Sequence, residues 1–474
     1  MVRRVLTVLL FAGVLAGASL STAALPTAAA GAKGARAMAV LDPSFGTHGL
    51  TKFRSGSESA ALGAATQDGG LVVSSGASVR LLSKRGGSGH LFGRSGSLTV
   101  PAAAGRGFQL GDFTVDPRGR LVIVGSSVYP ASENPTAKKG APVAFEPAAL
   151  RILRLLPDGS LDPSFGQGGV VETDLGLPAP LDTDGSVLGT HPALQATGIA
   201  IDPSGRIVIT GDSVVGLGPV CGRGQVPPVV VSAGFVLRLG ENGAADPTFG
   251  QGGLVGGRSL EELPLGAERI EEPVVGPAGT VAYRSSAADP CSRASEIGIA
   301  QLTATGTPNV TFGKAGALAG RYRALAGAPD GSVVAVEEIP APEGGAFKAR
   351  ISRYAPGGEP SASFGKGGRT TVTLAAGKGA AIQAAAVDAK GRVLLGGTLG
   401  AGKGRSLVLL RLSAAGGREK SFGPHGRVGT KVSGLIGPGS MFFDPQGRLL
   451  MVHAWSNVFK HHVGLVVARY LLRG

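Results

Sequence analysis

The sequence contains the stretch Leu161-Asp162-Pro163-Ser164-Phe165-Gly166-Gln167-Gly168-Gly169-Val170, and seven versions of it occur along the chain. Each version has a Phe-Gly pair, followed three residues later by another glycine. The intervals between pairs run from 47 residues (Phe45 to Phe92) to 84 residues (Phe165 to Phe249). This spacing is near the period of one blade of a β-propeller, lengthened by insertions. The aromatic residues of the motif are Phe45, Phe92, Phe165, Phe249, Phe312, Phe364 and Phe422.

Two further pieces recur between the Phe-Gly pairs. One is a turn of the form Asp-Pro-x-Gly-Arg, as in residues 116–120, 202–206 and 444–448, and the other is an apolar run such as residues 150–155. Short runs rich in branched residues, bounded by Gly, Pro and Asp, are typical of sequential antiparallel strands. No segment after residue 37 shows a sustained helical period. We therefore expect four strands in each repeat.

The two ends of the repeat region complement each other. Residues 39–46 enter at the Phe-Gly motif without a preceding strand, and residues 466–474 form a strand without a following motif. A ring that meets itself leaves no exposed sheet edge. The sequence predicts an all-β fold, a seven-bladed β-propeller of four-stranded antiparallel blades closed by adjacent N- and C-terminal segments. It would occupy residues 38–474 as a single domain.

Residues 1–37 have the pattern of a signal peptide and short linker. Arg3 and Arg4 precede an uncharged apolar stretch, and small-residue cleavage sites follow at residues 28–30 or 35–37. The alternative is an uncleaved membrane anchor, because residues 5–30 are nearly long enough to span a bilayer. In the first case the protein is secreted or on the cell surface, and membrane contact is expected only if the signal is retained.

The chain of 474 residues has a formal net charge of +14, and residues 1–37 contribute four basic residues and no acidic one, which leaves +10 without them. Such a charge favours acidic partners, such as an anionic cell-envelope polymer. Basic residues are spread along the chain and aromatic residues do not interleave with them, so we expect no nucleic-acid binding.

The combination of Leu-Asp-Pro-Ser-Phe-Gly-x-x-Gly, Asp-Pro-x-Gly-Arg and a Leu-Arg-Leu strand closely resembles the uncharacterised delta-60 repeat family. The resemblance covers essentially all of residues 39–474, although the copies at Phe92 and Phe312 lack the Asp-Pro pair. It implies a bacterial exported or surface β-propeller and no catalytic residues.

The motif residues have structural roles in this interpretation. Phe would pack between neighbouring sheets, and the glycines would permit the tight turn that follows. The recurring Asp and Arg could also be ligand groups, but they accompany turn residues every time, which favours a structural role.

The long connections fall in blades 2–4, and by strand counting they share the face opposite the motif turns, here called the insertion face. They are residues 126–148, 175–196, 212–232 and 285–295. Binding usually resides in loops carried on a rigid scaffold, so this face is a candidate binding surface. The alternative is that the loops on this face vary in length and sequence because they have no function.

Several polar or reactive residues are candidate site residues. Cys221 and Cys291 lie in corresponding loops of blades 3 and 4, and an exported chain with two cysteines favours a disulfide over a metal site or a nucleophile. The best constellation for ligand contact is in blade 7 and contains Trp455, Lys460, His461 and His462. Adjacent histidines do not face one another on a strand, so no metal site is predicted there. The carboxylate pairs 261–262, 271–272 and 337–338 are interpreted as solvated loop charge.

We expect an exported, monomeric, non-enzymatic scaffold without cofactors that binds a protein or a cell-surface polymer through the long loops of blades 2–4. The alternative is a propeller enzyme of the lactonase, lyase or quinoprotein type, with its site at the central channel. Such enzymes line the channel with polar residues at matched positions, which here are mostly Gly, Ala, Val and Leu. A purely structural role in the envelope is a third possibility that the residues do not separate from the first.

Overall fold

The fold was determined from a computed structural model, which describes residues 39–55, 62–75, 78–89, 96–130, 148–218, 229–288, 295–339, 346–376, 379–400, 405–423, 426–457 and 462–473. These residues all lie in one compact unit, Arg36–Gly474. The regular elements described are strands, apart from a 3₁₀ turn, η2 (Leu260–Glu262). No helix among them has the length and apolar character needed to cross a membrane. The predicted signal peptide lies outside the described residues, and the domain boundary after residue 37 stays a prediction.

The strands form small antiparallel sheets from consecutive segments. Four of the sheets have four strands each. The first contains β3 (Gly63–Ala65), β4 (Leu71–Ser75), β5 (Ser78–Leu82) and β6 (Ser97–Thr99), and the second contains β15 (Arg269–Val275), β16 (Val281–Ala288), β17 (Ser295–Leu302) and β18 (Ala317–Ala319). The third contains β19 (Tyr322–Gly327), β20 (Val333–Ile339), β21 (Ala346–Tyr354) and β22 (Arg369–Ala376), and the fourth contains β23 (Ala381–Val387), β24 (Val393–Leu399), β25 (Ser406–Leu412) and β26 (Arg427–Lys431).

A fifth sheet joins the two ends of the repeat region. It contains β27 (Leu435–Phe443), β28 (Leu449–Asn457) and β29 (His462–Leu472), together with β1 (Ala39–Leu41) and β2 (Leu50–Ser55). Both N-terminal strands pair antiparallel with β29, with Ala39 opposite Leu472 and Leu50 opposite Ala468. The expected junction between the N- and C-terminal segments is therefore present.

The sixth sheet has eight strands and corrects the prediction of seven separate blades. It contains β7 (Gly107–Val115), β8 (Leu121–Val128), β9 (Ala148–Leu155), β10 (Val170–Thr173), β11 (Ala193–Ile201), β12 (Ile207–Gly218), β13 (Val229–Leu239) and β14 (Leu254–Gly256). A single parallel pairing, Ala193 with Ala148, joins β11 to β9. The first residues of these two strands lie side by side, and the Ala148 N–H donates to the carbonyl of Pro192 (2.9 Å). The structure thus has five separate small sheets and one double-sized sheet.

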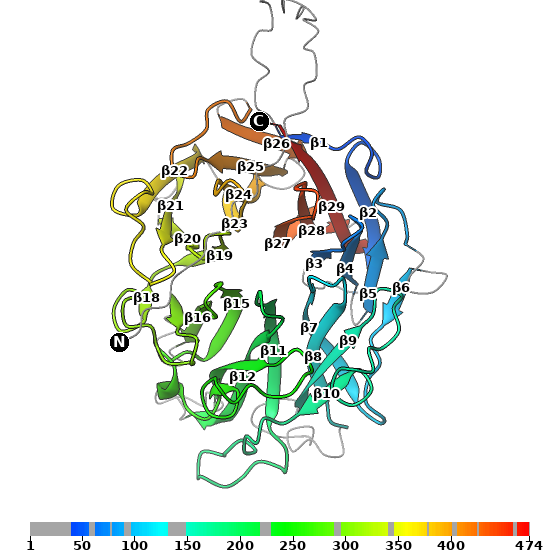
Figure 1. Cartoon of the computed structure of the whole chain (residues 1–474), viewed down its shortest axis with the longest axis vertical. Helices are drawn as coiled ribbons and strands as arrows, with labels where there is room; N and C mark the ends of the chain where they lie inside the picture. Colours follow the sequence, from blue (N-terminus) through cyan, green and yellow to red (C-terminus); the bar gives the residue numbers. More distant parts are fainter. Residues whose placement is uncertain are drawn as a thin grey trace, which may run out of the picture. The chain divides into compact units, whose positions relative to one another are not determined.

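The sheets stand around a common centre, with strands β3, β7, β11, β15, β19, β23 and β27 nearest to it (Figure 1). The core fills the spaces between neighbouring sheets. Phe45, for example, is buried in a cluster that includes Val73 of β4 and Val452 of β28, strands of two neighbouring sheets. The motif phenylalanines that the structure describes are all buried, as predicted, while Phe92 lies outside the described residues.

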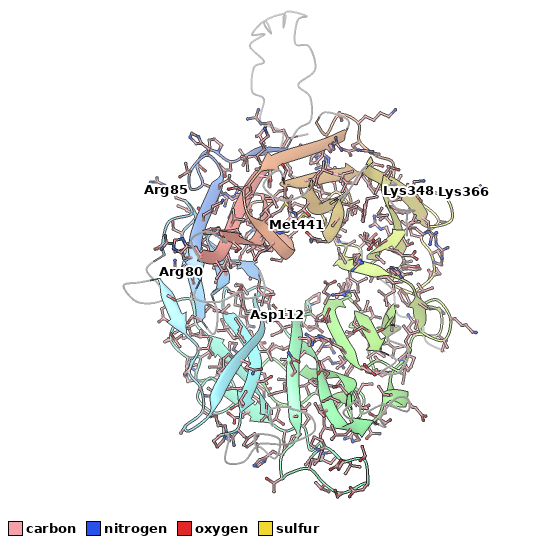
Figure 2. The ribbon with its side chains drawn as sticks, turned by 180° about the vertical axis from the view of Figure 1, so that it is seen from behind. Arg80, Arg85, Asp112, Lys348, Lys366 and Met441 are labelled. Carbon is pink, nitrogen blue, oxygen red and sulfur yellow. The ribbon has the colours of Figure 1, made fainter. Side chains whose placement is uncertain are left out.

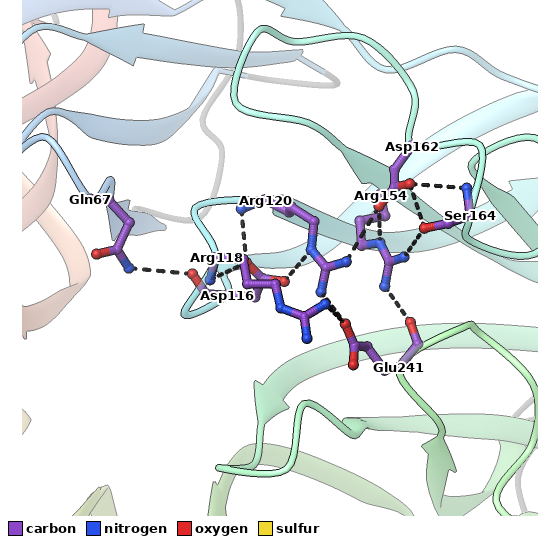
Figure 3. Close-up of polar contacts among 8 residues, drawn as sticks. All are labelled: Gln67, Asp116, Arg118, Arg120, Arg154, Asp162, Ser164 and Glu241. Carbon is purple, nitrogen blue, oxygen red and sulfur yellow. Dashed lines mark hydrogen bonds and ion pairs between the residues drawn. The ribbon is translucent and has the colours of Figure 1, made fainter.

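In several repeats, the Phe-Gly turn is held by a buried arginine from the strand before it. Arg154 Nε donates to Asp162 Oδ2 (2.8 Å), its Nη2 donates to Ser164 Oγ (3.0 Å), and its guanidinium lies 4.6 Å from the centre of the Phe165 ring. Its Nη1 donates to the backbone carbonyl of Glu241 in the next repeat (Figure 3). The same set of contacts recurs around Arg238 with Asp246 and around Arg469 with Asp42. A charge buried in this way needs a partner, which explains why Asp recurs in the motif.

The Asp-Pro-x-Gly-Arg segments are turns, as predicted. Asp116 Oδ1 accepts from the backbone N–H groups of Arg118 (2.9 Å) and Arg120 (2.8 Å), and Arg120 Nε donates to Asp116 Oδ2 (2.6 Å). Arg120 Nη1 also lies 3.5 Å from Asp162 Oδ2, so the two kinds of turn share one face of the ring. The recurring Asp and Arg residues therefore stabilise turns and the contacts between repeats.

Candidate functional site

A central cavity lies between the innermost strands. Its volume is about 1440 Å³. The lining comes from the inner strands β3, β7, β11, β15, β19, β23 and β27, and its polar members include Asp112, Gln195, Thr197, Arg269, Glu271, Glu272 and Arg284. The cavity is therefore the place where side chains from several repeats can meet a single ligand.

A β-bulge interrupts the inner strand in six of the repeats. The pairing with the second strand shifts at Leu110/Asp112, Ala196/Gly198, Glu271/Val274, Tyr322/Ala324, Ile382/Ala384 and Ile436/Gly439. A bulge adds one residue to one strand and redirects the local side chains. The inner edge of each sheet is thus the position at which sequence changes alter the cavity without disturbing the outer strands.

Polar side chains at three of these bulges bind the backbone of the next inner strand. Asp112 Oδ2 accepts from the Ile199 N–H (3.0 Å), and Glu272 Oε2 accepts from the Leu325 N–H (3.2 Å). Thr197 Oγ1 donates to the carbonyl of Ile270. These hydrogen bonds connect β7, β11, β15 and β19 in series around one half of the cavity.

A charged cluster formed by Asp212, Arg269, Glu271, Glu272 and Arg284 occupies this half. Arg269 Nε donates to Glu271 Oε1 (2.7 Å), and Arg284 Nη2 contacts both Glu271 and Glu272, the latter at 3.3 Å. Arg269 Nη1 lies 3.4 Å from Gln195 Oε1 and 4.0 Å from Asp212 Oδ1. Both arginines are therefore already compensated by carboxylates.

Asp112, Asp212 and Glu272 have raised pKa values. Loss of solvation raises the pKa of Asp112 to about 7, against the lowering effect of two backbone N–H donors, and the charge of Glu272 adds to the rise. Burial also raises the pKa of Asp212 to about 6, and it raises the pKa of Glu272 despite the nearby Arg284. Groups with such shifts gather at functional sites, because a protonation equilibrium near neutral pH is available there.

Two buried polar atoms at the charged cluster have no hydrogen-bond partner, Asp212 Oδ1 and Arg284 Nε. Asp212 is only 8% exposed, and its Cα is paired with that of Gln195, a cavity-lining residue. Buried polar atoms in folded proteins are nearly always hydrogen-bonded, so an unpaired one beside a cavity calls for an explanation.

The rest of the cavity wall is largely apolar. Met441, Phe442 and Phe443 of β27 line it, together with Leu62 and Phe113 from the neighbouring repeats. Asp112 and Met441 lie at the inner ends of their sheets, on either side of the centre (Figure 2). The cavity therefore combines a charged half with an apolar half.

Trp455 and His462, the predicted contact residues that the structure describes, do not lie in the cavity wall. Trp455 of β28 donates through Nε1 to the carbonyls of Phe53 (3.3 Å) and Leu465 (3.2 Å), and Lys52 lies 5.4 Å from its ring centre. His462 begins β29, which is adjacent to β28. Lys460, His461, Cys221 and Cys291 lie outside the described residues, so the ligand-contact set and the disulfide stay predictions.

The interpretation of residues 271–272 as solvated loop charge is wrong, because both lie in strand β15 and line the cavity. Residues 337–338 also lie in a strand, β20, where Glu337 pairs with Arg350 and Glu338 with Arg323. A signal was present in the sequence: Asp112 and Glu272 each stand four residues before the first residue of their turn, Asp116 and Gly276. At the corresponding position of the other repeats the residue is more often Gly or Ala, and this made the acidic residues hard to recognise as a pattern.

A protein-family profile described as "Domain of unknown function (DUF5122) beta-propeller" matches residues 146–165, which contain β9 and the turn that ends in Phe165. The matched segment is the motif that recurs around the ring of small antiparallel sheets. The chain is a β-propeller repeat protein. No curated protein matches the chain.

Solved structures with the same kind of fold are distant. A protein of unknown function from Dyadobacter fermentans is 14% identical, with a TM-score of 0.41, and the alignment covers 79% of this chain and 97% of that one. A protein of unknown function from Bacteroides caccae is 10% identical, with a TM-score of 0.29, over 63% of this chain and 78% of that one. Trypanosoma rangeli sialidase is 10% identical, with a TM-score of 0.35, over 91% of this chain and 59% of the sialidase. Likeness at this level assigns no activity to this propeller.

Proposed function

We propose that this chain is an exported propeller that works as a binding protein, with its ligand held in the central cavity against the charged cluster. The signal-like pattern of residues 1–37 supports the proposed export.

One observation carries the proposal: the cavity charges gather in the repeats that also carry long connections. Gln195 is the third residue of β11, which follows the connection of residues 174–192, and Arg269 begins β15. Asp212 and Arg284 lie near the middle of β12 and β16, the strands that precede two of the long connections. A ligand entering from the insertion face would meet both the loops and the charged cluster, and the loops could add contacts to a protein or an envelope polymer.

The bonding of the carboxylates favours binding over catalysis. Asp112 and Glu272 each use both oxygens on neighbouring N–H groups or on Arg284, which gives these carboxylates a structural role in holding neighbouring strands. Among the residues that the structure describes, no group of three or more His, Cys, Asp or Glu could hold a metal ion. A propeller enzyme using the same cavity is the second candidate, and the raised carboxyl pKa values are what favour it.

Crystals of the protein grown with a mixture of small polar and aromatic fragments test the cavity assignment. We expect fragment density in contact with Arg269, Glu271 or Arg284. An Arg284→Met variant, which keeps the length of the side chain but removes its charge, should lose that density, whereas Arg258→Met on the exposed turn near η2 should retain it. Fragments found only outside the cavity would overturn the assignment. Chemical turnover of a bound fragment would favour the enzyme alternative.

A further inference from the structure

We propose that the ligand of the central cavity is an organic cation with an apolar body, such as an aryl- or alkylamine. This inference rests on the proposed function, since it specifies the chemistry of the molecule that the cavity would hold. Three observations support it: the local charge balance, the unpaired acceptor of Asp212, and the apolar wall contributed by β27.

The charge balance at the cavity is opposite in sign to that of the whole chain. Asp112 and the charged cluster together contain four carboxyl groups and two guanidinium groups. The other acidic residues of the wall, Asp116 and Asp444, are each paired with the arginine of their own turn. With all groups ionised, the site has two negative charges in excess, in a chain with a formal net charge of +14. The cavity therefore lacks positive charge that a bound cation would supply.

The two arginines do not form an anion site. Arg269 is held by Glu271 and Gln195, and Arg284 is held by Glu271 and Glu272. An incoming anion would have to displace a carboxylate from these pairs and would be repelled by the remaining carboxylates. A cation that binds Asp212 Oδ1 displaces no hydrogen-bond partner of these arginines.

Asp212 Oδ1 is the acceptor best placed for a cation. It is buried, it accepts no hydrogen bond, and its nearest cationic atom is Arg269 Nη1 at 4.0 Å. Both residues beside it, Gln195 and Arg269, line the cavity. A ligand ammonium group donating to Asp212 and Gln195 would satisfy this acceptor with a charge-assisted hydrogen bond.

The apolar half of the wall selects for a ligand with a hydrophobic body. Met441, Phe442 and Phe443 lie on β27, and Leu62 and Phe113 extend the apolar surface toward the charged half. Aromatic rings and a methionine sulfur contact aromatic groups favourably. A hydrated inorganic cation would leave this surface in contact with water, whereas an arylamine would cover it.

The raised carboxyl pKa values predict a coupling between binding and proton release. Burial raises the pKa of Asp112 to about 7 and of Asp212 to about 6, and it raises the pKa of Glu272. Arg269, Arg284 and Glu271 are the other charged groups that face them. A bound cation stabilises the ionised carboxylates, so binding should release protons near pH 6–7 and should weaken as the pH falls.

Isothermal titration calorimetry of the full-length chain with benzylamine, benzyl alcohol and benzoate tests the proposal, because these probes share one ring and differ in charge. We expect benzylamine to bind at least about tenfold more tightly than the other two at pH 7.5, and to weaken at pH 5.5. Titrations in two buffers of different ionisation enthalpy should show net proton release. Methylamine, which lacks the ring, should bind more weakly than benzylamine.

Variants and a complex structure locate the binding. Asp212→Asn and Glu272→Gln should each weaken benzylamine at least fivefold, whereas Glu261→Gln, an equal charge change on the exposed η2, should have no effect. Unchanged affinity in both cavity variants would overturn the proposal. If benzoate or benzyl alcohol binds best and lies in the cavity, the cation assignment fails and cavity binding stands. If none of the probes occupies the cavity, the cation assignment and the proposed cavity binding both fail.

Discussion

Arg154 is almost fully buried, and its surroundings explain how the repeat tolerates a charge between two sheets. Asp162 compensates the guanidinium, and the Phe165 ring covers it. In other repeats, uncharged residues occupy the positions of the arginine and the aspartate. Gln301 and Asn309 replace the pair by a neutral hydrogen bond (2.6 Å), and in the repeat of β5 Leu81 packs over Gly89. Both partners have changed together in each case, as expected if an unpaired buried charge is costly.

Asp162→Asn should therefore destabilise the protein by about 3 kcal/mol, because it leaves Arg154 buried without a counter-charge. The double variant Arg154→Gln with Asp162→Asn, which reproduces the Gln301–Asn309 pair, should recover most of that loss. Urea unfolding followed by circular dichroism measures both, and Asp158→Asn on an exposed turn is the control. A double variant no more stable than the single one would contradict this account of the motif.

Asp112 gives a pH prediction at the same scale. Its pKa is raised in the folded protein to about 7 from 3.8, so the folded state favours the protonated carboxyl. The stabilisation is complete below the unfolded pKa and is lost as the pH rises through the folded pKa. Asp112→Asn cannot ionise, so between pH 5 and pH 8 the wild type should lose at least about 1 kcal/mol more stability than the variant. Urea midpoints at both pH values measure this, and an equal pH dependence would show that the carboxyl is ionised throughout.

At the scale of elements, the inner strands with their bulges set the shape of the cavity. The bulge of β11 brings Gly198 against β15, where a Cβ atom would lie 2.5 Å from Pro273 Cδ. The strands, the motif turns and the N- to C-terminal junction could be predicted from repeated residue types. The bulges could not be predicted, because the residues found at them, such as Asp112, Thr197 and Glu272, share no residue type. A bulge also adds only one residue to the variable number of residues between two motifs. The bridge between Ala148 and Ala193 was missed for a similar reason, since it depends on how two long connections end.

Gly198→Ala should destabilise the protein by about 2 kcal/mol, because the new methyl group must displace backbone and proline atoms of β15. Gly429→Ala in β26 is the matched control, since a Cβ atom there meets nothing within 4 Å. The control should be neutral or slightly stabilising, because it restricts only the unfolded chain. Thermal unfolding of both variants decides the matter, and equal effects would show that β11 and β15 can move apart at low cost.

At the scale of the whole molecule, stability depends on the sheet that unites the two ends of the repeat region. Strand β29 pairs with β28, β1 and β2, and Arg469 binds Asp42 across 427 positions of sequence. Truncation after residue 461 should therefore abolish cooperative thermal unfolding and make the protein sensitive to protease. Deletion of residues 1–35, which lie outside the compact unit, should leave the melting curve unchanged. A truncated chain that still unfolds cooperatively would show that the remaining sheets are stable without the junction.

The pairing of Ala39 with Leu472 also determines how the protein responds to mechanical force. The two residues lie opposite each other on antiparallel strands, so tension applied between them separates the hydrogen bonds of the ladder one after another, as in unzipping. A ladder loaded in shear would instead break all its bonds at once and resist a much larger force. An optical trap that pulls from residues 39 and 472 would open this junction at low force, before any of the other sheets unfolds.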